Sequence, residues 1–149
     1  MARRGEFDDF DLYIKRFKKI NGKVVRVGIL GKDGGDMGVI AVANEYGTDK
    51  AGRGNSVTIP ERSFLRTTFD DKKNIKKAVT INVAKVFDKK KSINKITDKI
   101  GIVMTAKVKE KIQSNIQPKN ATSTLAKKGS SRTLVDTGHL RDSIDYEVR

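Results

Sequence analysis

Apolar residues recur at helical intervals in the first part of the chain. Between positions 8 and 20, apolar side chains follow one another at steps of three, one, three and three: Phe10, Tyr13, Ile14, Phe17 and Ile20. These steps place the apolar side chains on one face of a helix, while the basic residues of the same stretch lie off that face. The pattern predicts a short amphipathic helix that docks on another surface and ends at Asn21-Gly22.

A second apolar series indicates a long helix that begins near Ser63. Its apolar positions continue at mostly three- and four-residue steps: Phe64, Leu65, Phe69, Ile75, Val79, Val83 and Val86. Charged residues 88–91 interrupt the series, and Ser92 is suited to cap the helix that follows. That next helix carries an apolar stripe over 93–116 and is predicted to end before Pro118. A helix of about 25 residues spans about 37 Å, so it must pack across a sheet or along a neighbouring helix.

Three stretches favour β-strands. Residues 23–30 are rich in valine and isoleucine, and residues 143–148 alternate apolar and charged side chains. A short extended piece is predicted over 57–59, because Pro60 disfavours helical backbone in the residue before it. The pattern leaves room for one more strand.

The connections between these elements are predicted from glycine, proline and polar residues. The stretch 31–36 has turn chemistry, 38–46 favours a short helix, and Gly47 is a typical helix terminator. A polar, glycine-rich loop is predicted over 47–56, and a flexible loop near 117–133.

The length of the chain suits a single domain, and its composition gives a strong positive charge. The chain has 149 residues, with 32 Lys and Arg against 18 Asp and Glu, and a formal net charge of +14. We predict one domain over 1–149 with an α+β fold, in which a small, mainly antiparallel sheet packs against one or two long helices. The charge favours polyanionic partners such as nucleic acid or an acidic protein surface.

The absence of cysteine excludes disulfides, thiol catalysis and cysteine-ligated zinc, and no apolar run approaches the about 20 residues of a membrane span.

The glycine-rich and acidic residues do not form a known catalytic pattern. The segment 31–38 lacks the residue order and the Lys-Ser/Thr ending of a phosphate-binding loop. Asp33 and Asp36 occupy turn positions, where aspartate bonds its own backbone. The adjacent Asp70 and Asp71 do not face each other on a helix. We therefore predict neither a metal nor a cofactor.

His139 is the single histidine, and a Ser–His–Asp arrangement could be imagined with Asp136 and Ser143. All three lie within one turn-rich octet and lack an oriented nucleophile. The local interpretation is one helical turn that ends near Ser143 and is capped by Asp136 or Thr137. We therefore expect no enzyme activity, and a hydrolase built on His139 is the weakest alternative.

Three motifs together resemble a known family. The first motif, residues 44–48, reads NEYGT, and the second motif, residues 59–66, reads IPERSFLR. The third motif reads LVDTGHLRDSI over 134–144 and follows TLAKKGSS over 124–131. In this order and rough spacing they resemble the virion morphogenesis proteins of long-tailed phages, which are head–tail connection, neck or tail-completion proteins. The family often has proline where this chain has Ser63.

The resemblance implies a structural role. The protein would be a virion component, assembled in the bacterial host cytoplasm, that forms a ring, commonly of six subunits, at the neck or tail end. Such a ring joins or completes head and tail around the channel through which the genomic DNA passes. Its partners would be further copies of itself, neighbouring neck, tail-terminator or tail-tube proteins, and DNA bound without sequence specificity. No membrane contact is implied.

Two sets of residues are the candidates for these contacts. The motif residues that we expect to shape the fold or the subunit interface are Tyr46, Gly47, Pro60, Arg62, Phe64, Leu65, Asp136, Gly138 and Leu140. The lysines that we expect to face the DNA channel or an acidic partner are Lys72, Lys73, Lys76, Lys77, Lys89, Lys90 and Lys91. Pro60 would fix an extended backbone, and Phe64 and Leu65 would anchor the start of a helix in the core. Gly138 is expected to adopt a positive φ and to place Leu140 on the core side.

The alternative function is that of a non-specific DNA-binding accessory protein. Lysines cluster over 72–77, 85–91 and 107–111, and they would attract phosphates by charge alone. Apart from Phe87, no aromatic side chain lies among them to stack on bases, and no zinc-finger, RNP or bZIP signature is present. Ring-shaped oligomers, or DNA retention without rings, would discriminate between the two functions.

Overall fold

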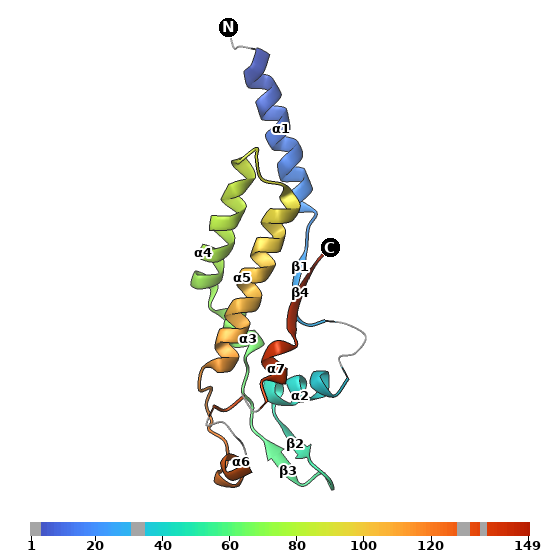
Figure 1. The fold of residues 1–149 in the computed structure, drawn as a ribbon, viewed down its shortest axis with the longest axis vertical. Helices are drawn as coiled ribbons and strands as arrows, with labels where there is room; N and C mark the ends of the chain where they lie inside the picture. The colour runs from blue at the N-terminus through green and yellow to red at the C-terminus, as the bar shows by residue number, and fades with distance from the viewer. Residues whose placement is uncertain (1–3, 31–34, 128–131, 135–136) are drawn as a thin grey trace.

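The computed structural model of the protein describes residues 4–30, 35–127, 132–134 and 137–149. It has the predicted α+β fold: a small antiparallel sheet packs against a long helix. In chain order the elements are α1 (Arg4–Asn21), β1 (Val25–Ile29), α2 (Gly35–Tyr46), β2 (Thr48–Ala51), β3 (Val57–Ile59), α3 (Leu65–Asp70), α4 (Lys72–Val83), the 3-10 helix η1 (Ala84–Phe87), α5 (Ile93–Gln113), α6 (Thr122–Lys127), α7 (His139–Asp142) and β4 (Ile144–Val148). The molecule is elongated, with α1 at one end and the β2–β3 hairpin and α6 at the other (Figure 1).

Helix α5 is the central element of the fold. It lies between α4 on one side and the paired strands β1 and β4 on the other (Figure 1). The two strands are antiparallel, in a register that runs from Val25 opposite Val148 to Ile29 opposite Ile144. Gly101 makes the close contact between helix and sheet possible, because a Cβ at that position would lie 2.1 Å from the Tyr146 ring. The prediction that the long helix packs across a sheet is therefore confirmed.

Two groups of buried apolar side chains form the core, and both use the predicted stripe of α5. Toward α1, the group consists of Val86, Ile93, Ile96, Ile100 and Met104. Toward α7, the group consists of Ala41, Phe64, Val108, Ile112, Leu134, Leu140 and Ile144. The core therefore runs along the length of α5.

The predicted single helix from Ser63 to Val86 is wrong, because the structure divides this stretch at Asp71. Asp71 has a non-helical backbone (φ −71°, ψ 67°), and its side chain accepts a hydrogen bond of 3.2 Å from the backbone N–H of Asn74. Asp71 is thus the N-cap of α4, and a separate short helix, α3, precedes it. The apolar spacing continues across this break, so hydrophobic periodicity alone could not reveal it.

Several predicted boundaries shift by a few residues. Ser92 caps α5 as predicted, accepting from the backbone N–H of Lys95 at 3.2 Å, but α5 ends at Gln113 rather than near 116. The loop predicted over 47–56 begins instead with strand β2, which pairs with β3 and is the additional strand. Similarly, the loop predicted near 117–133 contains the short helix α6.

The C-terminal half of helix α1 is fixed to the rest of the molecule. The guanidinium of Arg16 donates hydrogen bonds to three main-chain carbonyls around η1: Val86 (2.7 Å), Asp88 (2.9 Å) and Lys91 (2.6 Å). The N-terminal part of α1 extends beyond α4 and α5 (Figure 1). The predicted docking of its apolar face is therefore only partial. Within the described ranges, no helix has the length and apolar character needed to cross a membrane.

Candidate functional site

The first two motifs meet at a buried carboxylate, that of Glu45 in the last turn of α2. Glu45 is 4% exposed and accepts hydrogen bonds from the Ser63 hydroxyl at 2.6 Å and from the backbone N–H groups of Phe64, Leu65 and Arg66 at 2.9 Å each. These N–H groups lie at the start of α3, where a helix has no acceptors of its own. A side chain from α2 therefore caps α3.

The surroundings of Glu45 favour its ionised form. Burial alone would raise the pKa of the Glu45 carboxyl, but the hydrogen bonds from Ser63 and from the N–H groups of Arg66, Leu65 and Phe64 outweigh burial and lower its pKa. The negative charge also lies at the positive end of α3 and 3.3 Å from the Arg66 guanidinium. Glu45 is thus a fixed structural anion rather than a proton-transfer group.

Main-chain contacts reinforce the junction of the two motifs. The N–H of Arg62 donates to the Asn44 carbonyl at 2.7 Å. Gly47 has φ 74° and ends α2 as predicted, and a Cβ there would lie 2.9 Å from the backbone nitrogen of Glu61. Only glycine suits that position, both in backbone conformation and in space. The two predicted motif residues Gly47 and Arg62 are therefore brought together.

Tyr46 lies on the outer side of this junction. Its ring is 63% exposed, and the guanidinium of Arg66 lies 4.8 Å from the ring centroid. Arg66 also donates to the Glu61 carboxylate at 2.6 Å and to the Glu45 carbonyl at 2.9 Å. Arg66 thus orients Tyr46 at the surface, where the ring is available to a partner.

Arg62 is a buried cation that joins the second motif to the segment after α5. It is 6% exposed, and its guanidinium donates to the carbonyls of Pro118 at 2.8 Å and Lys119 at 3.2 Å. Burial lowers the pKa of Arg62. Among the residues that the structure describes, its partners are main-chain carbonyls rather than a carboxylate, so Arg62 holds the 118–119 backbone in place.

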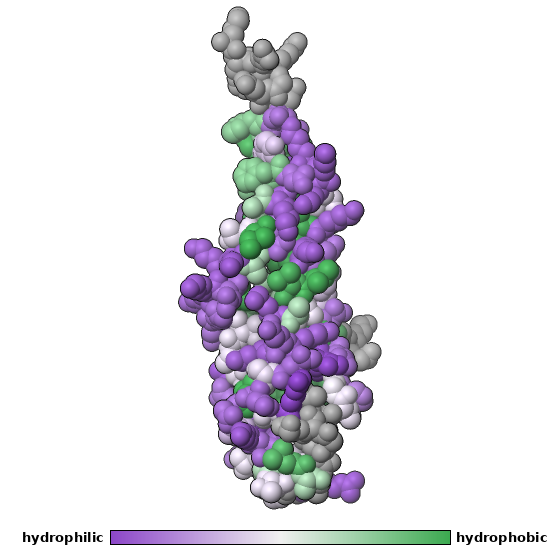
Figure 2. Space-filling model, turned by 60° about the vertical axis from the view of Figure 1, so that its left-hand side comes forward, coloured by the Kyte–Doolittle hydropathy of each residue, from purple (hydrophilic) through white to green (hydrophobic). Residues whose placement is uncertain are grey.

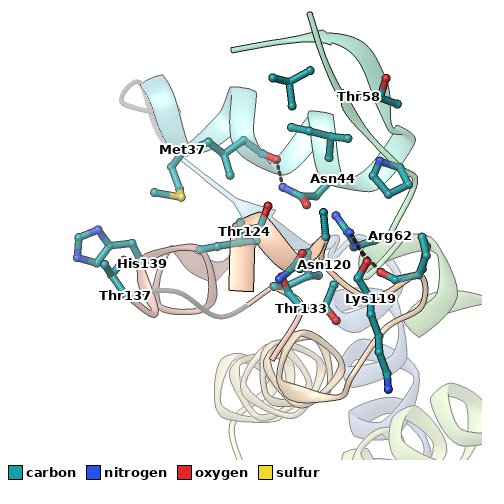
Figure 3. A pocket seen from close by; sticks show the side chains of 18 of the residues that line it. Met37, Asn44, Thr58, Arg62, Lys119, Asn120, Thr124, Thr133, Thr137 and His139 are labelled. Atoms are coloured by element: carbon teal, nitrogen blue, oxygen red, sulfur yellow. Dashed lines mark hydrogen bonds between the residues drawn. The ribbon is translucent and has the colours of Figure 1, made fainter. Parts of the chain in front are cut away.

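The three motifs line one groove of about 690 Å³. Asn44 comes from the first motif, Ile59, Pro60 and Arg62 from the second, and Leu134 and Gly138 to Leu140 from the third. Figure 3 shows Arg62, Lys119 and Asn120 on one side of this groove and Met37, Thr137 and His139 on the other. Segments that lie far apart in the sequence therefore form a single surface feature.

The third motif forms α7 as a single turn before β4. Gly138 is its N-cap with φ 87°, Leu140 is buried at 7% exposure, and Ile144 begins β4 at 1% exposure. The positive φ and the core placement are confirmed, whereas the predicted cap by Thr137 is wrong because Gly138 occupies the N-cap position. Asp136, the other proposed cap and a candidate site residue, lies outside the described residues. The Ser143 hydroxyl donates to the Leu140 carbonyl at 2.8 Å and is thereby a structural group.

The remaining motif residues lie where the sequence predicts them. Phe64 is fully buried, Leu65 is half-buried against the same core group, and Pro60 is half-buried at the groove after β3. Phe64 and Leu65 therefore do anchor the start of a helix in the core. That helix is the short α3 rather than a long one.

The candidate lysines fall into two groups with different surroundings. Those of α4, which are Lys72, Lys73, Lys76 and Lys77, are exposed. In the loop after η1, by contrast, Lys89 pairs with Asp9 of α1, and Lys91 lies 3.4 Å from the Asp88 carboxylate. Lys90 is exposed beside them. Since Lys89 and Lys91 already have anionic partners, the α4 lysines are the better candidates for an external anion.

Sequence reasoning missed the two most connected residues of the site, Glu45 and Arg66. Both are charged residues inside the motifs. The sequence signal that could have revealed them was a glutamate and an arginine within segments that we had interpreted as architectural.

The described ranges contain no group of three histidine, cysteine or acidic residues that could hold a metal ion. Comparison with known proteins found no family model, no curated protein and no solved structure that matches this chain.

Proposed function

We propose that the protein is a structural subunit of the neck or tail end of a long-tailed phage particle, which forms a ring that joins or completes head and tail around the DNA channel. The observation that carries this proposal is the convergence of the three motifs on one groove, with Glu45 and Arg62 as the connecting groups. When the motifs that carry the resemblance gather on one surface, that surface is expected to bind neighbouring subunits. The proposal includes a ring, commonly of six copies, with neighbouring neck or tail proteins and genomic DNA as its other partners.

An exposed apolar surface next to the groove supports a role in assembly. On α2, Val39 is 71% exposed, Val42 is 59% exposed and Tyr46 is 63% exposed, at helical steps of three and four. Val57 of β3, which is 50% exposed, adds an apolar side chain from the hairpin. We call Val39, Val42 and Tyr46 the α2 row. Apolar rows of this kind are typical of surfaces that a partner subunit covers.

The positive charge supports an anionic neighbour. A ring of such subunits would concentrate charge that needs a counter-charge, either from DNA in the channel or from an acidic ring beside it. The four α4 lysines are the side chains proposed to supply this contact.

The deciding experiment is electron microscopy of a lysate in which only this gene is deleted. We expect filled heads beside finished but unattached tails if the subunit acts at the joining step. Tails of uncontrolled length would instead identify a tail terminator, which is a second form of the same proposal. Normal infectious particles would contradict it.

Complementation of the deletion tests the surface. Val42→Glu, in the α2 row, is expected to fail, while the matched control Ile102→Glu, at a 53% exposed position of α5, is expected to restore particles. Equal behaviour of the two variants would count against the α2 row as an assembly surface. Purified variants with native circular dichroism would show that a failure is one of assembly.

The second candidate function is non-specific DNA binding, which the exposed α4 lysines favour. It predicts that the purified protein retains DNA without forming rings, with an affinity that falls steeply with salt. Replacing Lys72, Lys73, Lys76 and Lys77 by glutamine would then weaken binding more than replacing Lys89, Lys90 and Lys91. Normal particles in the deletion lysate together with this pattern would make DNA binding the function.

A further inference from the structure

Helix α1 carries a row of exposed apolar side chains. Phe10 is 64% exposed, Ile14 is 37% exposed and Phe17 is 40% exposed, and their steps of four and three place them on one side of the helix. We call these three residues the α1 row. Figure 2 shows hydrophobic side chains among hydrophilic ones in the upper part of the molecule, the end where α1 lies.

Of the α1 row, Phe17 takes part in the contact that fixes α1 to the body. The neighbouring side of the helix makes the rest of that contact: Arg16 binds the carbonyls around η1, and the Tyr13 ring lies 5.7 Å from the Phe87 ring. Phe17 touches Phe87 edge to face at 5.3 Å, yet Phe87 itself stays 58% exposed. The aromatic contact thus extends the exposed apolar surface from α1 onto η1 and holds it in one orientation.

The charges of α1 are separated along the helix. Among the side chains that the structure describes, the N-terminal half of α1 has the acidic Asp9 and Asp11, and the C-terminal half has the basic Lys15, Arg16, Lys18 and Lys19. Asp9 pairs with Lys89 and Arg16 binds main-chain carbonyls of the same copy, so Asp11 and the three lysines are the charges that a second copy would meet. A second α1 laid antiparallel over the α1 row would place its basic half against this acidic half, and the reverse. A parallel arrangement would place like charges together. The helix is therefore complementary to itself in one direction only.

We propose that α1 is a self-association surface, on which a second copy of the chain docks its own α1 in the antiparallel direction. The two α1 rows would face each other around a two-fold axis near Ile14, with Asp11 of one copy next to Lys15 or Lys18 of the other. DNA or an anionic membrane would be repelled by the acidic half, which is why a second copy is the better occupant. This inference is independent of the proposed function.

Sedimentation of the full-length protein over a range of concentrations tests the association. We expect a monomer–dimer equilibrium at about 0.15 M salt, where screening over about 8 Å weakens the repulsion between two copies of net charge +14 more than it weakens groups in contact. Phe10→Ser combined with Ile14→Ser should give a monomer with unchanged circular dichroism. The control Ile102→Ser removes an exposed apolar side chain elsewhere and should leave the dimer intact.

Disulfide cross-linking tests the direction, since the natural chain has no cysteine. A mixture of the Asp11→Cys and Lys18→Cys proteins should cross-link to each other more than either protein does to itself. Preferred cross-linking of Asp11→Cys to itself would overturn the antiparallel arrangement. A protein that stays monomeric at every concentration would overturn the proposal altogether, as would a monomer whose α1 binds vesicles of phosphatidylserine and phosphatidylcholine.

Discussion

The hydroxyl of Ser63 donates a hydrogen bond of 2.6 Å to the carboxylate of Glu45, which lies 18 positions earlier in the chain. This bond, with the three N–H bonds to the same carboxylate, makes the start of α3 depend on the end of α2. Because a short helix is marginal on its own, the cap decides whether α3 forms. The position of Phe64 in the core therefore depends on a residue of another helix.

The first prediction concerns the charge of Glu45. Glu45→Gln should lower the free energy of unfolding by about 2 to 3 kcal/mol, because an amide cannot accept all the hydrogen bonds that the buried carboxylate accepts. Urea denaturation measures the change. The control Glu61→Gln alters an exposed carboxylate paired with Arg66 and should change it by less than about 1 kcal/mol. Equal losses would show that the cap is not what stabilises α3.

The second prediction concerns acid pH. The pKa of Glu45 is lower in the folded state than its ordinary value of 4.5, so its contribution to stability is present above pH 4.5 and is lost as the pH falls through the folded pKa. Below pH 4.5 the unfolding free energy of the natural protein should therefore fall more steeply with decreasing pH than that of Glu45→Gln. Parallel curves for the two proteins would contradict this role.

The third prediction concerns the close contact between α5 and the sheet. Gly101→Ala should destabilise the protein by about 1 to 3 kcal/mol, because the added methyl group would overlap the Tyr146 ring. Gly38→Ala, in α2, is the matched control: a Cβ there meets nothing within 4 Å, so the higher helix propensity of alanine should stabilise the protein by up to about 1 kcal/mol. Thermal unfolding of both variants checks the opposite signs.

The fourth prediction concerns two threonines of α5. The Thr105 hydroxyl is buried without a hydrogen-bond partner among the described residues, whereas the Thr97 hydroxyl donates to the Asn94 carbonyl at 2.9 Å. Thr105→Val should therefore stabilise the protein by about 1 kcal/mol, since it removes an unsatisfied polar group at nearly constant volume. Thr97→Val should be destabilising by a similar amount. A loss of stability in Thr105→Val would mean that its hydroxyl has a partner, such as a buried water.

The fifth prediction concerns the chain after α5. Arg62→Met removes the two hydrogen bonds to the Pro118 and Lys119 carbonyls and should expose this backbone. We expect trypsin to cleave after Lys119 faster than in the natural protein. Arg53→Met, at an exposed position between β2 and β3, is the control and should leave that cleavage unchanged. Unaltered cleavage in Arg62→Met would show that other contacts hold the segment.

Regular patterns made most of the fold predictable from the sequence. The apolar stripe of α5, its Ser92 cap and the terminal strand β4 follow from residue spacing and capping chemistry, and the structure confirms them. The break at Asp71 could not be predicted in this way, because the apolar spacing on both sides suits one continuous helix. A capping aspartate was the only local signal there.

The site was predictable only in part, since its connections are not local. The motifs identified Tyr46, Gly47 and Arg62 as structural, and these residues do lie at one junction. The charged groups at that junction interact because the end of α2 lies close to the start of α3 in space. Sequence spacing contains no information on the distance between these two elements, so the roles of Glu45 and Arg66 appeared only in the structure.

The pairing of β1 with β4 has a consequence for the order in which the molecule forms. The two strands lie more than one hundred positions apart in the chain, while α4 and α5 are near neighbours in sequence. Closing so large a loop is slow, and local contacts form sooner. The α4–α5 hairpin should therefore fold first, and one of its apolar faces should stay exposed to solvent until β1 and β4 pair. During that interval the newly made chain is most exposed to aggregation and to chaperones.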